Sequence, residues 1–185
     1  DGHEMTWGTN HLGHFLLTEL LLPLVEKSPE GRIVNVASLG HTFSPALDLP
    51  TIDDCLSDFK ASIAYTKSKL ANVMHAREMA RRLRLRGVTT VTVNAVHPGA
   101  IATELIRDLG PLYKISFYVL ALFLKSWKDG AQTSLYCALS AEVKGVSGQY
   151  FSDCARKTEA PLARDDLACK QLYDYSLKAV GLPIY

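Results

Sequence analysis

At 185 residues, the chain is long enough to form one domain with a buried core. Hydrophobic residues make up 48% of it, as in ordinary globular proteins. Its 20 basic and 19 acidic residues nearly cancel, so the overall charge gives no support for nucleic-acid binding.

The first half of the chain predicts two helices separated by a strand. A leucine-rich helix covers residues 11–25 and breaks near Pro23. After a turn at residues 28–31, the apolar, β-branched run 32–38 predicts a strand that is covered on both faces, as in a parallel sheet. Residues 40–58 form a loop, and one long helix follows over residues 61–86, with Gly87 as its cap.

The second half repeats this alternation of strands and helices. A strand over residues 88–96 is ended by His97-Pro98-Gly99, and a strand over residues 148–152 follows later. Helices are predicted at 102–108, 130–141 and 165–180, with a strongly apolar stretch at 112–127. The alternation predicts an α/β fold with a parallel sheet, and ligands of such sheets bind beyond the carboxyl ends of the strands.

Basic residues cluster on the long helix at Arg77, Arg81, Arg82, Arg84 and Arg86. They recur with a helical period beside apolar residues, so we expect a solvated helix face rather than a binding surface.

Histidines and cysteines give no metal signal. His11 and His14 have no third ligand nearby, so we interpret both as ordinary helix residues. The four cysteines suit neither a zinc site nor a disulfide framework, so we expect reduced thiols in a cytosol-facing protein. They are Cys55, Cys137, Cys154 and Cys169.

Tyr65 and Lys69 lie four residues apart on the long helix, so their side chains share one face. A nearby ammonium stabilises a phenolate, which equips a tyrosine to exchange a proton with an alcohol oxygen. A surface tyrosine beside a solvated lysine is the simpler alternative. However, Ser38 ends one strand, His97-Pro98-Gly99 ends the next, and Tyr65 lies on the helix between them, so all three should meet at one edge of the sheet.

Four segments in this order resemble the short-chain dehydrogenase/reductase family. They are Asn-His-Leu-Gly-His-Phe at 10–15, the strand that ends in Ser38, Tyr-Thr-Lys-Ser-Lys at 65–69, and Pro-Gly-Ala-Ile-Ala-Thr at 98–103. Further segments resemble its retinol dehydrogenase group, at 10–18, 68–72, 130–134 and 148–154. The implied fold is a Rossmann-like doubly wound parallel sheet. Residues 1–185 would be a single incomplete domain, the catalytic and substrate-binding part, without the amino-terminal nucleotide-binding strands.

The resemblance implies four catalytic residues. Tyr65 would act as general acid in carbonyl reduction and as general base in alcohol oxidation. Lys69 would lower the pKa of Tyr65 and hydrogen-bond the nicotinamide ribose. Ser38 would bind the substrate oxygen, while Asn10 would hold a helix distortion and a water that links Lys69 to solvent.

Cofactor binding is implied for Tyr65, Lys69, Pro98, Gly99 and Thr103. Gly99 lacks a Cβ, which lets a ligand approach the backbone, and Thr103 would bind the nicotinamide carboxamide or a nearby phosphate. A turn without a ligand is the alternative at 98–103. The group resemblance favours NADP, with NAD not excluded, and the glycine-rich turn that binds pyrophosphate in the family has no counterpart here.

The implied function is hydride transfer between NADP(H) and a retinoid or similar lipid aldehyde or alcohol. The resemblance also implies a protein of the endoplasmic reticulum membrane that faces the cytosol, with its anchor outside this chain, and a possible homodimer through residues 11–25 and 61–86. The apolar stretch 112–127 is too short to cross a bilayer. It predicts either a buried or dimer-contacting helix, or a lid over the substrate that touches the membrane surface.

The sequence leaves two other functions open. Ser38-Leu39-Gly40 matches half of a hydrolase nucleophile elbow, but Val36 occupies the position of its first glycine, which disfavours a hydrolase. A non-catalytic truncated fragment, or a partner-binding module, is the alternative to an enzyme, and NADPH binding distinguishes the two.

Overall fold

The computed structural model describes residues 2–52, 61–99 and 126–185. The predicted helix 102–108, with Thr103, lies outside the described residues, as does the apolar stretch except for its last residues. The prediction of a lid is therefore carried forward as a prediction.

A four-stranded sheet forms the centre of the molecule, in the order β1-β2-β3-β4. Its strands are β1 (Gly31–Val36), β2 (Val91–His97), β3 (Tyr150–Ser152) and β4 (Ala155–Lys157). β1 pairs with β2 and β2 with β3 in parallel, whereas β3 and β4 are antiparallel. The predicted α/β fold with a mainly parallel sheet is confirmed.

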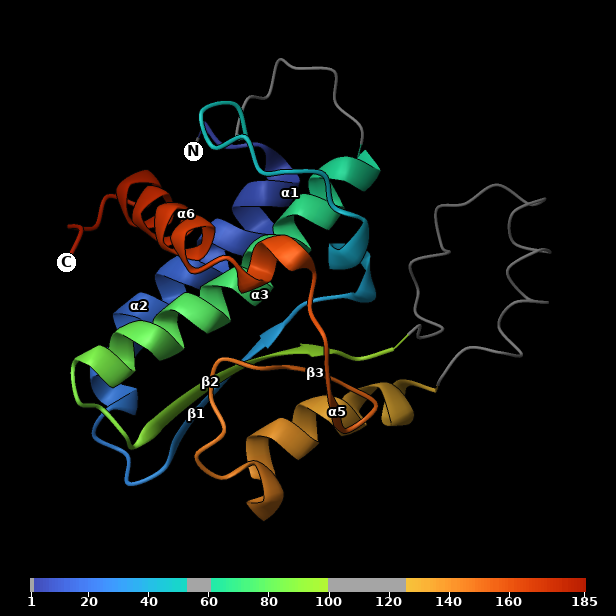
Figure 1. Ribbon diagram of the computed structural model, residues 1–185, viewed down its shortest axis with the longest axis vertical. Coiled ribbons are helices and arrows are strands. Elements are labelled where there is room, and N and C mark those ends of the chain that lie inside the picture. The colour runs from blue at the N-terminus through green and yellow to red at the C-terminus, as the bar shows by residue number, and fades with distance from the viewer. Residues whose placement is uncertain (1, 53–60, 100–125) are drawn as a thin grey trace.

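Helices cover both faces of this sheet (Figure 1). One face carries most of them and the other carries α5. The helices are α1 (Met5–Trp7), the π-helix η1 (Gly8–Leu12), α2 (Gly13–Val25), α3 (Ala61–Leu85), α5 (Trp127–Leu139) and α6 (Asp166–Ala179). Short 3-10 turns complete the set, at η2 (Leu39–Phe43), η4 (Ala141–Val143) and η5 (Pro161–Arg164).

The main core lies between α3 and the elements packed around it. α3 is buried along most of its length, and Met74 and Met79 are both only 1% exposed. Trp7, Phe15 and Tyr173 bring large rings from α1, α2 and α6 into the same core. A smaller cluster under α5 contains Val96, Cys137, Val143 and Phe151. Burial of these apolar side chains on both faces of the sheet holds the helices against each face.

Pro23 does not break the first helix, contrary to the prediction, because α2 continues through it to Val25. A proline removes one backbone donor, and this loss falls near the end of the helix, where Glu26 N–H still bonds Leu22 O at 2.9 Å. The helical segment also begins earlier than predicted, at Met5, where the Glu4 carboxylate accepts the N–H groups of Thr6 and Trp7.

The hairpin between β3 and β4 was not predicted. Asp153 and Cys154 connect the strands with φ of 54° and 55°. Two successive positive φ values are typical of the two-residue hairpin turns that usually contain Asn-Gly or Asp-Gly. Because Cys replaces the glycine, the sequence carries only half of the usual signal.

The prediction of a solvated arginine face is wrong for Arg82. This side chain is only 7% exposed, and its Nε donates to the fully buried Glu78 at 2.8 Å. Arg82 also bonds Asp174 and donates to the Tyr185 carbonyl at 2.9 Å. It therefore joins α3 to α6 and to the last residue of the chain.

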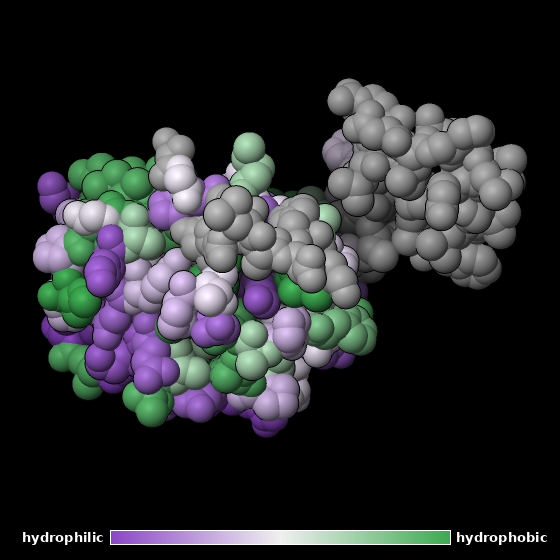
Figure 2. Space-filling model, turned by 90° about the horizontal axis from the view of Figure 1, so that it is seen from above, coloured by the Kyte–Doolittle hydropathy of each residue, from purple (hydrophilic) through white to green (hydrophobic). Residues whose placement is uncertain are grey.

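The view from above shows hydrophobic and hydrophilic residues interspersed over the surface (Figure 2). Within the residues that the structure describes, no helix has both the length and the apolar character needed to cross a bilayer.

Candidate active site

Ser38 lies two residues beyond the end of β1, where the chain is extended, with φ −158° and ψ 157°. It caps the η2 turn, and its Oγ accepts the Gly40 N–H at 3.1 Å. This bond occupies a lone pair of the hydroxyl and not its proton, so Ser38 can still donate a hydrogen bond.

Tyr65 and Ser38 face each other across Gly40. A Cβ built on Gly40 would lie 3.4 Å from Ser38 Oγ and 3.4 Å from Tyr65 Cε1. The phenol is 41% exposed. The absence of a side chain at Gly40 therefore leaves the serine hydroxyl and the tyrosine ring next to each other, with the ring open to solvent.

Lys69 reaches the same end of β1 from the following turn of α3. Its Nζ lies 5.7 Å from the centroid of the Tyr65 ring and donates to Val36 O at 3.2 Å. Burial lowers the pKa of Lys69 below its ordinary value. The tyrosine, the ammonium and the serine are thus gathered at the carboxyl end of one strand, as predicted from their order in the sequence.

Asn10 lies in the π-helix η1, so the helix distortion expected at this residue is present. Asn10 Nδ2 donates to Ser68 Oγ at 3.2 Å, and the Ser68 hydroxyl donates to the Tyr65 carbonyl at 2.8 Å. The Asn10 side chain is therefore connected to the helix turn that carries Tyr65. Its proposed water relay remains a prediction.

Pro98 and Gly99 directly follow β2. β1 and β2 run in parallel, with Val36 beside Val96, so Ser38 and Pro98 leave the sheet at the same edge. The Ala37 N–H bonds Val96 O at 2.8 Å, which holds the two strand ends together. Gly99 has a φ of 94°, a conformation that favours glycine.

Two residues outside the predicted set support the site: Asn72 contacts it, and His11 contacts Asn72. Asn72 Nδ2 donates to the carbonyls of Asn10 and Val36, at 3.0 and 3.3 Å. His11, interpreted above as an ordinary helix residue, is fully buried, and its Nδ1 lies 3.2 Å from Asn72 Oδ1. Asn72 follows Lys69 by three positions and lies on the helix face that carries Tyr65. This spacing was the signal in the sequence that could have placed Asn72 at the site.

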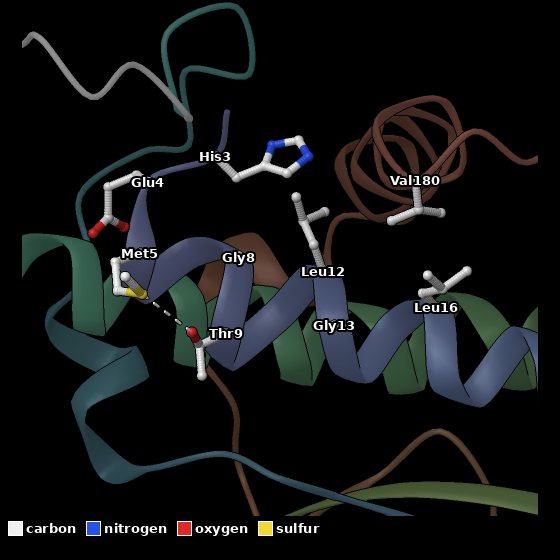
Figure 3. Close-up of a pocket in the computed structure, with 9 residues that line it drawn as sticks. All are labelled: His3, Glu4, Met5, Gly8, Thr9, Leu12, Gly13, Leu16 and Val180. Atoms are coloured by element: carbon white, nitrogen blue, oxygen red, sulfur yellow. Dashed lines mark hydrogen bonds between the residues drawn. The ribbon is translucent and has the colours of Figure 1, made fainter. Parts of the chain in front are cut away.

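A separate cavity of about 430 Å³ lies along α1, η1 and α2 and is bounded on one side by Val180 (Figure 3). Thr9 donates a weak hydrogen bond to Met5 Sδ at its edge, at 3.9 Å. None of its lining residues is a predicted site residue. A smaller cavity, about 230 Å³, lies between α2 and β1 and includes Val36, Asn72 and His75.

Comparison with known proteins identifies the relatives of this chain. It is 43% identical over 190 residues to human retinol dehydrogenase 14, an alignment that covers 98% of this chain and 54% of that protein. The chain therefore spans about half the length of that relative. No protein-family model matches it.

Solved structures give the same fold. A protein of uncharacterized function from Mycobacterium paratuberculosis has a TM-score of 0.72 at 28% identity, covering 96% of this chain and 60% of that one. NADPH-bound carbonyl reductase from chicken fatty liver has a TM-score of 0.55 at 19% identity, covering 83% and 55%. The chain is also 40% identical over 191 residues to short-chain dehydrogenase TIC 32 B of Brassica napus, covering 97% of this chain and 58% of that protein. With its parallel sheet and these homologues, it belongs to the short-chain dehydrogenase/reductase family.

Proposed function

We propose that this chain carries the catalytic part of an oxidoreductase that interconverts a retinoid, or a similar lipid aldehyde, and the corresponding alcohol. The observation that supports it most directly is the grouping of Ser38, Tyr65 and Lys69 at the carboxyl end of β1. The identity to retinol dehydrogenase 14 supports the retinoid as substrate. Because the chain spans about half of that relative, the activity is proposed for the protein that contains these residues.

The residues at this edge of the sheet fit a nicotinamide cofactor. Gly99, with its positive φ, presents backbone without a Cβ beside the strand end, and the Lys69 ammonium offers donors to ribose hydroxyls. Pro98 and Thr103 belong to the same proposed contact. When bound, the cofactor supplies or accepts the hydride. We propose NADP(H) as the cofactor, on the group resemblance, and NAD remains the comparison in any binding test.

The protein's own residues would position the substrate oxygen and handle its proton. The Ser38 hydroxyl donates a hydrogen bond to that oxygen, which lies close to the Tyr65 hydroxyl. In reduction the Tyr65 O–H transfers its proton to the oxygen, and in oxidation the phenolate accepts a proton from the alcohol. The nearby Lys69 ammonium favours the phenolate by charge.

The catalytic assignment is tested with Tyr65→Phe and Lys69→Ala, in the longest form of the protein that contains these 185 residues. Tyr65→Phe should lower turnover at least a hundredfold, the usual contribution of general acid–base catalysis, and leave NADPH affinity largely intact. Lys69→Ala should reduce both. Tyr136→Phe is the matched control, because Tyr136 of α5 bonds Glu142 of η4 and, among the described residues, bonds none of the proposed site residues. Equal turnover by Tyr65→Phe and the unmodified protein would refute the assignment.

Cofactor binding separates the enzyme from the alternative of a non-catalytic fragment or partner-binding module. Nicotinamide fluorescence should report NADPH binding, measured for the 185-residue chain and for the longest form. Binding by the longest form alone would assign the chemistry to that form. Binding by neither form would refute the proposed function.

From the resemblance we propose that the enzyme lies at the endoplasmic reticulum membrane, with its active site facing the cytosol. We also propose a homodimer through α2 and α3. The exposed surface of α2 supports a contact there. It carries four leucines at helical spacing, each at least 44% exposed, namely Leu17, Leu20, Leu21 and Leu24. Sedimentation of the protein at several concentrations tests the dimer.

A further inference from the structure

Asn72 lies where the π-helix, the end of β1 and the lysine meet. Its side-chain nitrogen has two hydrogens, and each has a carbonyl partner: Asn10 O at 3.0 Å and Val36 O at 3.3 Å. The Lys69 ammonium binds the same Val36 carbonyl at 3.2 Å. A carbonyl oxygen has two lone pairs, so Val36 O can accept both donors at once.

The two carbonyls fix the direction of this amide, and His11 lies against its oxygen. With its nitrogen facing two carbonyls, Asn72 turns Oδ1 toward His11 Nδ1, at 3.2 Å. An amide oxygen only accepts, so Nδ1 must carry the proton. Burial lowers the pKa of His11 to about 4, and the ring is neutral at pH 7. Its Nε2 lies 2.8 Å from Ser176 Oγ on α6, and the Ser176 hydroxyl also bonds Leu172 O at 2.8 Å.

A reversed amide would place its oxygen against the two carbonyl oxygens of Asn10 and Val36. That contact is repulsive, and both carbonyls would lose a donor. The two carbonyls thus favour one orientation of Asn72, in which its oxygen faces His11.

From these contacts we propose that Asn72, held by His11, is a positioning residue of the active site. Asn72 keeps the Asn10 turn and the Val36 carbonyl in place. Through these two groups it keeps the Lys69 ammonium beside Tyr65. This inference rests on the proposed function, and adds two residues that act through Lys69 and Asn10. Neither is assigned contact with substrate or cofactor.

The test compares Asn72→Leu with Asn94→Leu. Asn94 is a matched control because it is also 3% exposed and also donates to a main-chain carbonyl, Val146 O at 2.7 Å, but touches none of the site residues. Both variants should lose similar stability. In the longest form of the protein, Asn72→Leu should move the midpoint of the pH profile of alcohol oxidation upward by about one unit, because a displaced ammonium no longer favours the phenolate.

Asn94→Leu should leave this midpoint in place. An unchanged midpoint in Asn72→Leu, or an equal shift in both variants, would overturn the proposal. If Asn72→Leu does not fold, Asn72→Ala replaces it. That variant also loses both donors without adding a charge, and the same upward shift is expected.

A second measurement needs no turnover. Acetic anhydride should modify Lys69 roughly fivefold faster in Asn72→Leu than in the unmodified 185-residue chain, the equivalent of one net hydrogen bond. The exposed Lys178 serves as the internal reference, and mass spectrometry gives the ratio. Unchanged labelling of Lys69 would overturn the positioning role. If the unmodified protein shows no oxidoreductase activity, the proposed function fails, and this arm still decides whether Asn72 holds Lys69.

Discussion

Two buried histidines should make the folded chain sensitive to mild acid. His11 and His75 are 0% and 3% exposed, and burial lowers their pKa values from 6.5 to about 4 and about 3, respectively. Each also faces the other ring, at 6.3 Å between centroids, and His14 further disfavours the charge on His11. Both rings are therefore neutral in the folded state at pH values where the unfolded chain binds protons.

The direction of the pH dependence follows from this difference in bound protons. Unfolding takes up protons below pH 6.5, so the free energy of unfolding is highest above that pH. It falls as the pH drops toward the folded-state pKa values of about 4 and 3. Between pH 7.5 and 5.5, each histidine should lower the free energy of unfolding by about 1.4 kcal/mol, or by about 2.7 kcal/mol for the pair. A typical domain has a free energy of unfolding of roughly 5–15 kcal/mol, so this loss is a large part of it.

Urea unfolding at several pH values measures this effect. Trp7 is 1% exposed, and its ring centroid lies 4.7 Å from that of His11, so its fluorescence reports on this part of the core. His75→Leu should remove about half of the pH dependence. Burial also lowers the pKa of His41, which adds a further fall in the same direction. A free energy of unfolding that stays constant from pH 7.5 to 5.5 would refute the reasoning.

Two substitutions test the packing. Gly31→Ala should lower stability by about 1–3 kcal/mol, because its Cβ would lie 2.7 Å from Val25 Cγ1 and 2.9 Å from Val25 O. An unchanged urea midpoint would contradict this. Arg82→Met should cost about 1.5–3 kcal/mol, since the fully buried Glu78 loses one of its two arginine partners and keeps only Arg81, and the double variant with Glu78→Gln should recover part of this loss. Thermal unfolding of the single and double variants gives the comparison, and equal stability of the two would exclude the pairing explanation.

The sequence identified the parallel sheet because its signals are local and repeated. β-branched runs alternate with long periodic helices, and each strand ends in turn residues. The spacing of Tyr65 and Lys69 on one helix face needed only the pitch of an α-helix. That Ser38 would join them needed one further rule, that parallel strands end at the same edge.

Other features depended on partners that are distant in the chain. Arg82 belongs to a periodic row of arginines, and the approach of α6 and of the last residue of the chain makes it a buried residue. The β3–β4 hairpin depended on two positive φ values at residues with no strong preference for them. Such contacts leave no local pattern.

The role of Asn72 shows the same division. The sequence alone placed it on the helix face of Tyr65 and Lys69. Its partners Asn10 and His11 lie 62 and 61 positions away, and His11 in turn contacts Ser176, which is 165 positions from His11. Local backbone preferences decide where helices and strands form, whereas the pairing of buried polar groups is decided only when packing removes water from all of them at once.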